Sequence, residues 1–388
     1  MSNNNKTPAI RFKGFTDTWE QRKLDEVITV GNGMDYKHLS EGDIPVYGTG
    51  GYMLSVDKAL SYDKDAIGIG RKGTIDKPYV LKAPFWTVDT LFYCIPKEDY
   101  SLDFVYCIFQ NVNWKEKDES TGVPSLSKVN INSTDAKVPA LAEQEKIGAY
   151  FSKLDSLITL HQRKCDKLIQ FKAAMLQKMF PQNGADKPEI RFKGFTDAWE
   201  QRELGELVEF YNGDRSSRYP NDSDMVSDGV PFINAGDLVS GRVKLDTANK
   251  ITEEKFNELS GAKIQRGDII YCLRGTLGKN AFVDNFDVGT VASSLVDIRP
   301  KKVVGKYLFQ VLNSDIEYTQ RTVNDEGAAQ PNLSAKNLSL FNIPMPDEIE
   351  QEKIAAYFDD LDRLITLHQR KCDKYKSIKA GLIRKLFP

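Results

Sequence analysis

Two segments of this chain occur twice, and these repeats constrain the fold more than any other feature. The residues at 8–22 return at 188–202 with 13 of 15 positions identical, and those at 143–167 return at 350–374 with 21 of 25 identical. The inserts between them, roughly 34–140 and 214–347, hardly resemble one another. A repeated order of arm, insert and long segment predicts a duplicated frame that carries two divergent modules.

The longer repeat places a stripe of mostly apolar residues at alternating steps of four and three. The stripe lasts more than four heptads in both copies, which is typical of a coiled-coil seam. A helix of about 36 residues is roughly 54 Å long at ~1.5 Å per residue. We predict that the two helices pair with each other in antiparallel fashion; the alternative is that each helix packs only on its own insert. The predicted seam contains Ile147, Phe151, Leu154, Ile158, His161, Cys165, Ile354, Phe358, Leu361, Ile365, His368 and Cys372.

The seam includes a histidine and a cysteine four residues apart in each copy. Antiparallel pairing would bring His161, Cys165, His368 and Cys372 together, which resembles a Cys₂His₂ zinc site. The alternative is a polar layer that fixes register and partner. We favour the second interpretation, because zinc sites rarely interrupt a continuous seam, and we predict no metal.

The inserts combine short β-rich runs, broken by Gly, Asp and Pro, with a few helical stretches. The predicted fold is α/β (α+β): two mixed α/β domains joined by two long helices that pair as an antiparallel coiled coil, with a pseudo-twofold internal repeat. We predict a first arm and mixed α/β domain at 1–141 and a first long helix at 142–181. A linker at 182–187 leads to a second arm and mixed α/β domain at 188–347 and a second long helix at 348–388. Strands are predicted at 44–47, 66–69, 79–81, 91–95, 230–233, 268–273, 280–283 and 295–298, and helices near 102–111 and 306–322.

Motifs for catalysis are missing. Residues 68–73 match G-x-G-x-x-G by letter, but Pro78 follows too soon for the helix that a dinucleotide site needs. We therefore predict a strand–turn–strand there. We find no GxxxxGK[ST] loop and no [DNS]PP[YFW] motif, and two of the three histidines belong to the seam. We predict no catalytic residues in this chain.

Composition limits the setting. Five cysteines without CxxC spacing fit a reduced cytoplasm better than a disulfide framework. The first residues have no apolar core of a secretory signal, and no apolar run approaches the ~20 residues of a membrane span. The net charge of −2 is low for a nucleic-acid binder. Positive charge must therefore be local, or partner proteins must supply it.

Both inserts carry residues suited to nucleic acid on glycine-flanked turns and on a polar loop ahead of the frame. Arginine can grip a phosphate or guanine, and Asn and Gln can read adenine. The alternative is an ordinary loop and helix cap leading back into the frame. The candidate contacts are Arg71, Lys72, Thr74, Ser125, Ser127 and Lys128 in the first half, and Arg274, Thr276, Lys279, Gln330, Asn332, Ser334, Lys336 and Asn337 in the second.

Several motifs in this order resemble the specificity subunits of Type I restriction–modification enzymes. They are the I-R-F-x-G-F-x-x-x-W arm, GDI-x(5)-GT-x-G at 267–278, N-L-S-x-x-N-L-x-x-F-x-I-P-x-P at 332–346, and the E-Q-x-K-I helix start. They cover almost the whole chain. The match is weaker in the first half, where 66–74 replaces the GDI stretch and 125–127 replaces Asn-Leu-Ser.

The resemblance implies a non-catalytic subunit with two target recognition domains. Each would read one half of a bipartite, asymmetric site in double-stranded DNA, and the coil would fix the gap. Two modification subunits would methylate adenine with S-adenosylmethionine, and restriction subunits would cleave with ATP and Mg. Two alternatives stay open: a free-standing enzyme, which the missing motifs disfavour, and a DNA-binding or adaptor protein outside restriction, such as an orphan subunit or a regulator.

Overall fold

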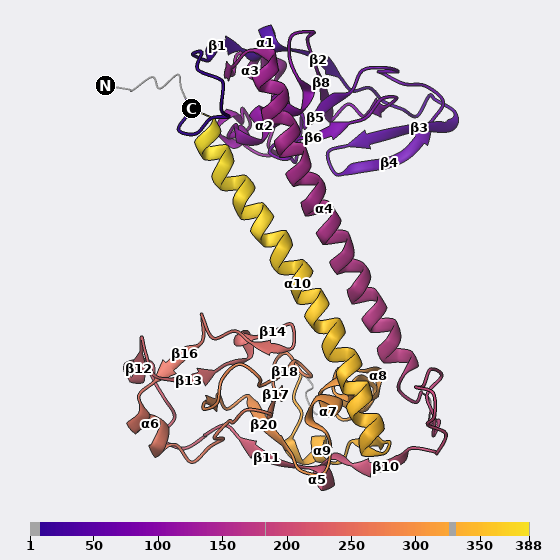
Figure 1. The fold of residues 1–388 in the computed structure, drawn as a ribbon, viewed down its shortest axis with the longest axis vertical. Helices are drawn as coiled ribbons and strands as arrows, with labels where there is room; N and C mark the ends of the chain where they lie inside the picture. The colour runs from indigo at the N-terminus through magenta and orange to yellow at the C-terminus, as the bar shows by residue number, and fades with distance from the viewer. Residues whose placement is uncertain (1–7, 183, 326–330, 388) are drawn as a thin grey trace. The chain divides into compact units, whose positions relative to one another are not determined.

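A computed structural model describes residues 8–182, 184–325 and 331–387. The chain divides into two compact units, residues 1–163 with 368–388 and residues 164–367. The helices α4 (Leu141–Lys178) and α10 (Glu348–Leu386) each contribute one part to each unit (Figure 1). Each unit therefore contains one insert, called here the first head (34–140) or the second head (214–347), together with a part of both long helices.

The first unit is built around a four-stranded antiparallel sheet in the order β2-β8-β5-β6. A second sheet, β4-β3-β7, extends the head, and β1 of the arm pairs with β9. The elements are β1 (Glu20–Lys23), α1 (Leu24–Val27), β2 (Ile28–Asn32), β3 (Glu41–Gly48), β4 (Gly51–Val56), β5 (Ala66–Gly70), β6 (Tyr79–Leu81), β7 (Trp86–Thr87), β8 (Leu91–Pro96), α2 (Leu102–Asn111), the 3₁₀ helix η1 (Trp114–Lys117), α3 (Lys128–Asn132) and β9 (Asp135–Val138).

The second unit repeats this plan. Its four-stranded antiparallel sheet has the order β11-β20-β17-β18, and β10 of the arm pairs with β21. The sheet β12-β16-β13-β19 and the pair β14-β15 extend this head. The elements are β10 (Glu200–Glu203), α5 (Leu204–Leu207), β11 (Val208–Asn212), η2 (Asp222–Asp224), β12 (Met225–Val226), β13 (Val230–Ile233), η3 (Ala235–Asp237), β14 (Leu238–Val239), β15 (Arg242–Val243), β16 (Asn249–Ile251), α6 (Glu253–Glu258), β17 (Ile269–Cys272), β18 (Asn280–Phe282), β19 (Thr290–Val291), β20 (Leu295–Pro300), α7 (Gly305–Val311), α8 (Asp315–Val323), α9 (Ala335–Ser339) and β21 (Asn342–Met345).

The mixed α/β class is confirmed, and each strand predicted in the inserts overlaps an observed one. The G-x-G-x-x-G stretch runs from the end of β5 into the turn toward β6, and the two strands pair antiparallel, so the strand–turn–strand prediction is confirmed. The single helix predicted near 306–322 is wrong. It breaks into α7 and α8, because the hydroxyl of Ser314 accepts a hydrogen bond from the N–H of Ile316 and starts a second helix.

A buried tryptophan anchors each arm to the core of its unit. In the first unit Trp19 packs edge-on against Phe104 of α2 and Phe387 at the end of α10. In the second unit Trp199 packs edge-on against Phe180 and Tyr307. Large aromatic side chains bury up to about 250 Å² each. The arm, the head and both long helices therefore share one hydrophobic core in each unit.

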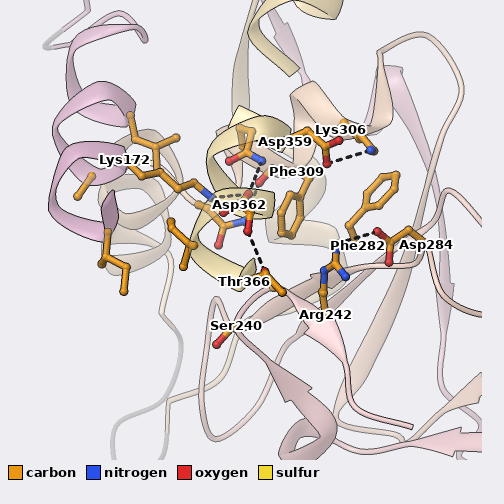
Figure 2. Close-up of a pocket in the computed structure, with 17 residues that line it drawn as sticks. Lys172, Ser240, Arg242, Phe282, Asp284, Lys306, Phe309, Asp359, Asp362 and Thr366 are labelled. Atoms are coloured by element: carbon orange, nitrogen blue, oxygen red, sulfur yellow. Dashed lines mark hydrogen bonds and ion pairs between the residues drawn. The ribbon is translucent and has the colours of Figure 1, made fainter. Parts of the chain in front are cut away.

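The two long helices contact each other within both units. In the second unit Lys172 Nζ lies 2.7 and 2.8 Å from the carboxylate oxygens of Asp362 (Figure 2). In the first unit Lys379 Nζ lies 2.5 and 2.7 Å from those of Asp155. Each unit has a further contact between the helices, and within each unit the residue numbers rise along one helix as they fall along the other. The helices therefore run antiparallel, and the alternative in which each packs only on its own insert is wrong.

Candidate nucleic-acid interface

A tight turn follows β17 in the second head. The N–H of Cys272 donates to the carbonyl of Lys279 at 2.8 Å, and the N–H of Gly278 donates back to Cys272 at 3.3 Å. Gly275 and Gly278 have φ of 80° and 79°, a backbone region that favours glycine. The turn leaves Arg274 and Thr276 exposed at its tip. An arginine on such a turn can approach a phosphate or a base edge closely.

The polar loop ahead of α9 lies directly beside this turn. The N–H of Leu333 donates to the carbonyl of Leu273 at 2.9 Å, and the N–H of Gly275 donates to Pro331 at 3.2 Å. Arg274 Nε donates to Asn332 Oδ1 at 3.2 Å. Two segments 58 residues apart thus place a guanidinium beside an amide, the two groups that best recognise guanine and adenine.

The first head contains the same arrangement. The N–H of Gly73 donates to the carbonyl of Pro124 at 2.8 Å, and the N–H of Leu126 donates to the backbone carbonyl of Arg71 at 2.9 Å. Lys72 forms the backbone bridge with Ser125 that Arg274 forms with Asn332.

This pairing shows which candidates are equivalent. Lys72 corresponds to Arg274, Ser125 corresponds to Asn332, and Thr74 corresponds to Thr276. Arg71 instead occupies the position of a leucine in the second head, and its guanidinium lies 5.8 Å from the centre of the Phe92 ring.

An aspartate that the sequence analysis did not select fixes the loop segment in each half. Asp118 Oδ1 accepts a hydrogen bond from the N–H of Ser125 at 2.9 Å, and Asp325 Oδ1 accepts one from Asn332 at 2.9 Å. The hydrogen bond from Ser125 lowers the pKa of Asp118 below its usual value. An Asp seven residues before the bridging residue in both halves is the signal that could have identified the pair.

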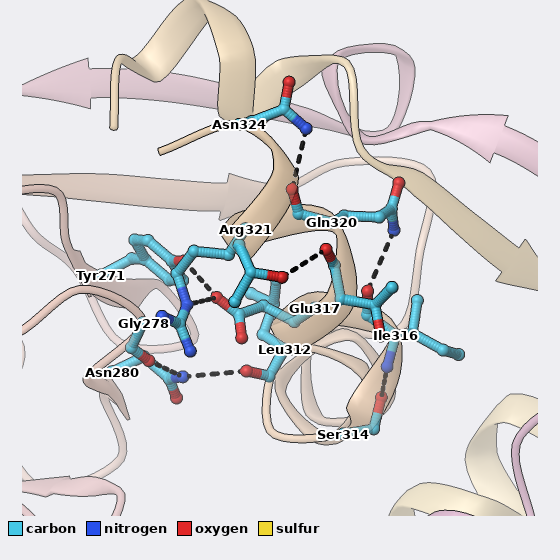
Figure 3. Close-up of polar contacts among 12 residues, drawn as sticks. Tyr271, Gly278, Asn280, Leu312, Ser314, Ile316, Glu317, Gln320, Arg321 and Asn324 are labelled. Carbon is cyan, nitrogen blue, oxygen red and sulfur yellow. Dashed lines mark hydrogen bonds and ion pairs between the residues drawn. The ribbon is translucent and has the colours of Figure 1, made fainter. Parts of the chain in front are cut away.

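A buried polar network lies behind the turn of the second head (Figure 3). The hydroxyl of Tyr271 donates a hydrogen bond to Glu317 Oε1, and Arg321 Nε donates to the same oxygen at 2.7 Å. Burial, and then the charge of Glu317, raise the pKa of Tyr271. A Cβ atom built on Gly278 would lie 2.6 Å from Arg321 Nε, so the guanidinium packs against the turn itself.

A second donor steadies the same turn from the other side. Asn280 Nδ2 donates to the carbonyls of Gly278 at 2.9 Å and Leu312 at 3.2 Å (Figure 3). The network therefore connects the turn that carries Arg274 to α8 and to the end of α7. Ile69 of the first head corresponds to Tyr271, because each lies two residues before the equivalent positions Arg71 and Leu273. Ile69 is fully buried and apolar.

Other candidates have structural contacts of their own. The hydroxyls of Ser127 and Ser334 each accept a backbone N–H, from Asn130 and Asn337, both at 3.1 Å, and cap α3 and α9. Lys279 Nζ donates to the carbonyl of Ala235 at 2.7 Å. Lys336 is exposed, whereas Lys128 and Asn337 are half-buried. Gln330 lies outside the described residues.

The twelve predicted seam residues are all buried or half-buried. His161 Nδ1 and His368 Nδ1 lie 2.8 Å apart. The thiol of Cys372 instead faces the carbonyl of Ile158 at 3.9 Å in the first unit, and that of Cys165 faces Ile365 at 4.0 Å in the second. Over the described ranges, no group of three or more His, Cys, Asp or Glu side chains could hold a metal ion. Among the residues that the structure describes, no helix combines the length and the apolar character needed to cross a membrane.

Each unit thus combines one insert with parts of both long helices and carries an equivalent pairing of turn and loop. A family profile described as "Type I restriction modification DNA specificity domain" matches residues 16–170 and 196–376. The chain therefore belongs to the Type I restriction–modification DNA specificity family.

Several relatives are distant in sequence. The MjaIX specificity subunit of Methanocaldococcus jannaschii is 21% identical over 406 residues, 95% of this chain and 92% of that protein. The MjaVIII subunit of the same organism is 22% identical over 284 residues, 70% of this chain and 65% of that one. The HindI subunit of Haemophilus influenzae is 27% identical over 202 residues, which are 49% of this chain and 40% of that protein. The chain thus spans under two thirds of the length of the last two relatives.

A solved structure has the same fold. The crystal structure of the S subunit of a Type I restriction–modification system from M. genitalium matches 98% of this chain and 99% of its own, with a TM-score of 0.70 and 15% identity. A second structure, from work on complex assembly of the Type I system, matches 95% and 97% with a TM-score of 0.51 and 16% identity.

Proposed function

We propose that this chain is the non-catalytic specificity subunit of a Type I restriction–modification complex. Each head reads one part of a bipartite, asymmetric site in double-stranded DNA. The observation that carries this proposal is the equivalent pairing of turn and loop in both heads, Lys72 beside Ser125 and Arg274 beside Asn332. The same backbone frame with different side chains at its tip suits two readers of different sequences.

Base recognition in this proposal comes from few contacts. An arginine fork pairs with the O6 and N7 atoms of guanine, and an Asn amide pairs with N6 and N7 of adenine. Lysine and serine, at the matching positions of the first head, are less restrictive donors and acceptors. Phosphate contacts position the protein without selecting sequence. With a net charge of −2, this chain grips phosphates in this proposal through local positive charge or together with more basic partners.

The partners in this proposal are two modification subunits and the restriction subunits, in the cytoplasm. S-adenosylmethionine, ATP and Mg belong to those subunits, and this chain directs adenine methylation and cleavage to a site. Residues 1–141 and 188–347 read DNA, the helical segments 142–181 and 348–388 form the spacer, and 182–187 links the halves. A second reader on the same chain also raises affinity, because its binding is intramolecular.

The direct test is to exchange one head and to sequence the methylated sites. A chain whose residues 214–347 come from another family member is expressed with the cognate modification subunit. We expect one half of the methylated site to change while the other half and the gap stay the same. The matched control exchanges 34–140 and should change only the other half.

Two outcomes would contradict the proposal. A site that changes in both halves, or in neither, would show that the heads do not read separate halves. A chain that binds DNA but never co-purifies with a modification subunit would instead support a DNA-binding or adaptor protein outside restriction.

A further inference from the structure

The two copies of the long repeat differ at only four of 25 positions. The four pairs are Gly148 and Ala355, Ser152 and Asp359, Lys153 and Asp360, and Ser156 and Arg363. The first two pairs lie where α4 meets α2 of the first head and where α10 meets α7 of the second head. These two differences are therefore candidates for contacts that distinguish one head from the other.

A shared pattern of hydrogen bonds shows which head residues are equivalent. Gln144 Oε1 accepts the N–H of Ser101, ahead of α2, at 3.1 Å. Gln351 Oε1 accepts the N–H of Val304, ahead of α7, at 3.0 Å. Ser101 therefore corresponds to Val304, and two residues further on Asp103 corresponds to Lys306. The heads thus present opposite charges at one position of the same joint.

In the first unit α2 approaches α4 closely at Gly148. A Cβ atom built there would lie 2.8 Å from Asp103 Cβ and 2.9 Å from the backbone N of Phe104. Contacts this short require the backbone to move, so only glycine fits. Asp103 and Ser152 line one cavity of about 450 Å³ at this joint, and the serine adds no negative charge beside the aspartate.

In the second unit the same joint has the opposite chemistry. Ala355, at the position of Gly148, is accommodated and 4% exposed. Lys306 Nζ lies 3.0 Å from Asp359 Oδ1, and both residues line a cavity of about 450 Å³ between the helices and the head (Figure 2). The acidic residue of this helix thus faces the basic residue of this head.

We propose that these two differences match each long helix to its own head, so that each head docks on the long helix that follows it in the chain. The first head placed on the second helix would press Asp103 against the methyl group of Ala355 and bring its carboxylate near Asp359. The second head placed on the first helix would lose the ion pair of Lys306 and leave space above Gly148. The first exchange is the more costly, because overpacking and like charge act together.

A chain with the first head in both positions tests the proposal. Residues 214–347 are replaced by 34–140, with or without Ala355→Gly and Asp359→Ser, which give the second helix the docking residues of the first. We expect the two substitutions to raise the Tm of this duplicate by about 2–6 °C, because they relieve overpacking. In the native chain the same two substitutions should lower the Tm by about 4 °C, because glycine weakens the helix and Lys306 loses its ion pair with Asp359.

The reversal of sign is the decisive result. If the pair of substitutions lowers the Tm in both chains, or leaves the duplicate unchanged, the heads dock without discrimination and the proposal fails. Methylation by the duplicate reports separately on reading, since a well-docked duplicate should mark a site with two copies of the first half-site.

A second set of variants in the native chain tests the proposal even if the duplicate is insoluble. Gly148→Ala should lower the Tm by roughly 5 °C. Ser152→Asp should also lower it, and Asp103→Lys added to that variant should recover the loss by recreating the pair of Lys306 with Asp359. Unchanged stability for Gly148→Ala, or no recovery in the double variant, would overturn the inference.

Discussion

The buried ion pair that ties each arm to its long helix provides the sharpest test of the structure. Arg191 donates from Nε and Nη2 to the two carboxylate oxygens of Glu350, both at 2.7 Å, and Trp199 Nε1 donates to Oε2 at 3.1 Å. The Glu350 side chain is fully buried and that of Arg191 is 14% exposed. One carboxylate therefore satisfies the arm's cation and its tryptophan together.

Replacing Glu350 by alanine removes the acceptor of Trp199 Nε1 and the carboxylate partner of Arg191, whose Nη1 still donates to the carbonyl of Asp197 at 2.6 Å. Removing one partner of a buried ion pair costs about 3–5 kcal/mol. A loss of 1 kcal/mol lowers the Tm of a domain of this size by about 2–4 °C, so we expect a decrease of roughly 6–20 °C. The double variant Arg191→Met with Glu350→Leu should recover most of the loss, because apolar side chains of similar volume replace a buried pair at little cost.

The assay is urea unfolding followed by circular dichroism, with calorimetry for the Tm. The matched control is Glu206→Ala, which removes the exposed pair with Arg202 and should cost under about 0.5 kcal/mol. If Glu350→Ala costs no more than this control, or if the double variant is as unstable as the single one, the pair does not hold the arm. The equivalent Glu143→Ala should act alike through Arg11.

Three further predictions concern the second unit. Arg274→Ala should weaken DNA binding by about 1–3 kcal/mol and relax base selection in one half-site only. Gel-shift titrations with each half-site mutated in turn check this prediction, and an equal loss of affinity for every DNA would contradict base reading by Arg274. Glu317→Gln should destabilise the chain by about 1–3 kcal/mol and disturb the same half-site through Tyr271, whereas unchanged discrimination would limit the network to stability. Burial, and then the charge of Asp268, raise the pKa of Asp297 to about 8, above the ~3.9 of an unfolded chain. The stability that the protonated Asp297 contributes is therefore complete below about pH 4 and is lost as the pH rises through about 8. The free energy of unfolding of Asp297→Asn, measured in urea, should therefore increase relative to that of the wild type as the pH rises between these values. Parallel pH profiles of the two proteins would refute the shift.

Local patterns in the sequence were sufficient for the elements of the frame. A heptad stripe specifies a long helix with one apolar face, because helical geometry places residues three and four apart on one side. β-rich runs between turn residues specified strands such as β13 and β6 for similar reasons. Helix breaks were harder to predict. Ser314 divides a helical stretch because its side chain caps the next helix, and the spacing of apolar residues carries no information about such a cap.

Tertiary structure alone decided which distant residues of the heads meet. The carboxylates of Asp118 and Asp325 hold the loops through backbone N–H groups, and their shared spacing of seven residues becomes a signal only once the structure shows which loop residues are equivalent. Glu317 is buried, and Tyr271, 46 residues earlier, donates a hydrogen bond to it. A local pattern encodes the direction of a side chain along its own element, whereas a contact between elements depends on how the sheets and helices pack. The sequence by itself therefore determined the elements, their doubling and the candidate contact residues, and only packing decided which of these residues lie side by side and which buried groups support them.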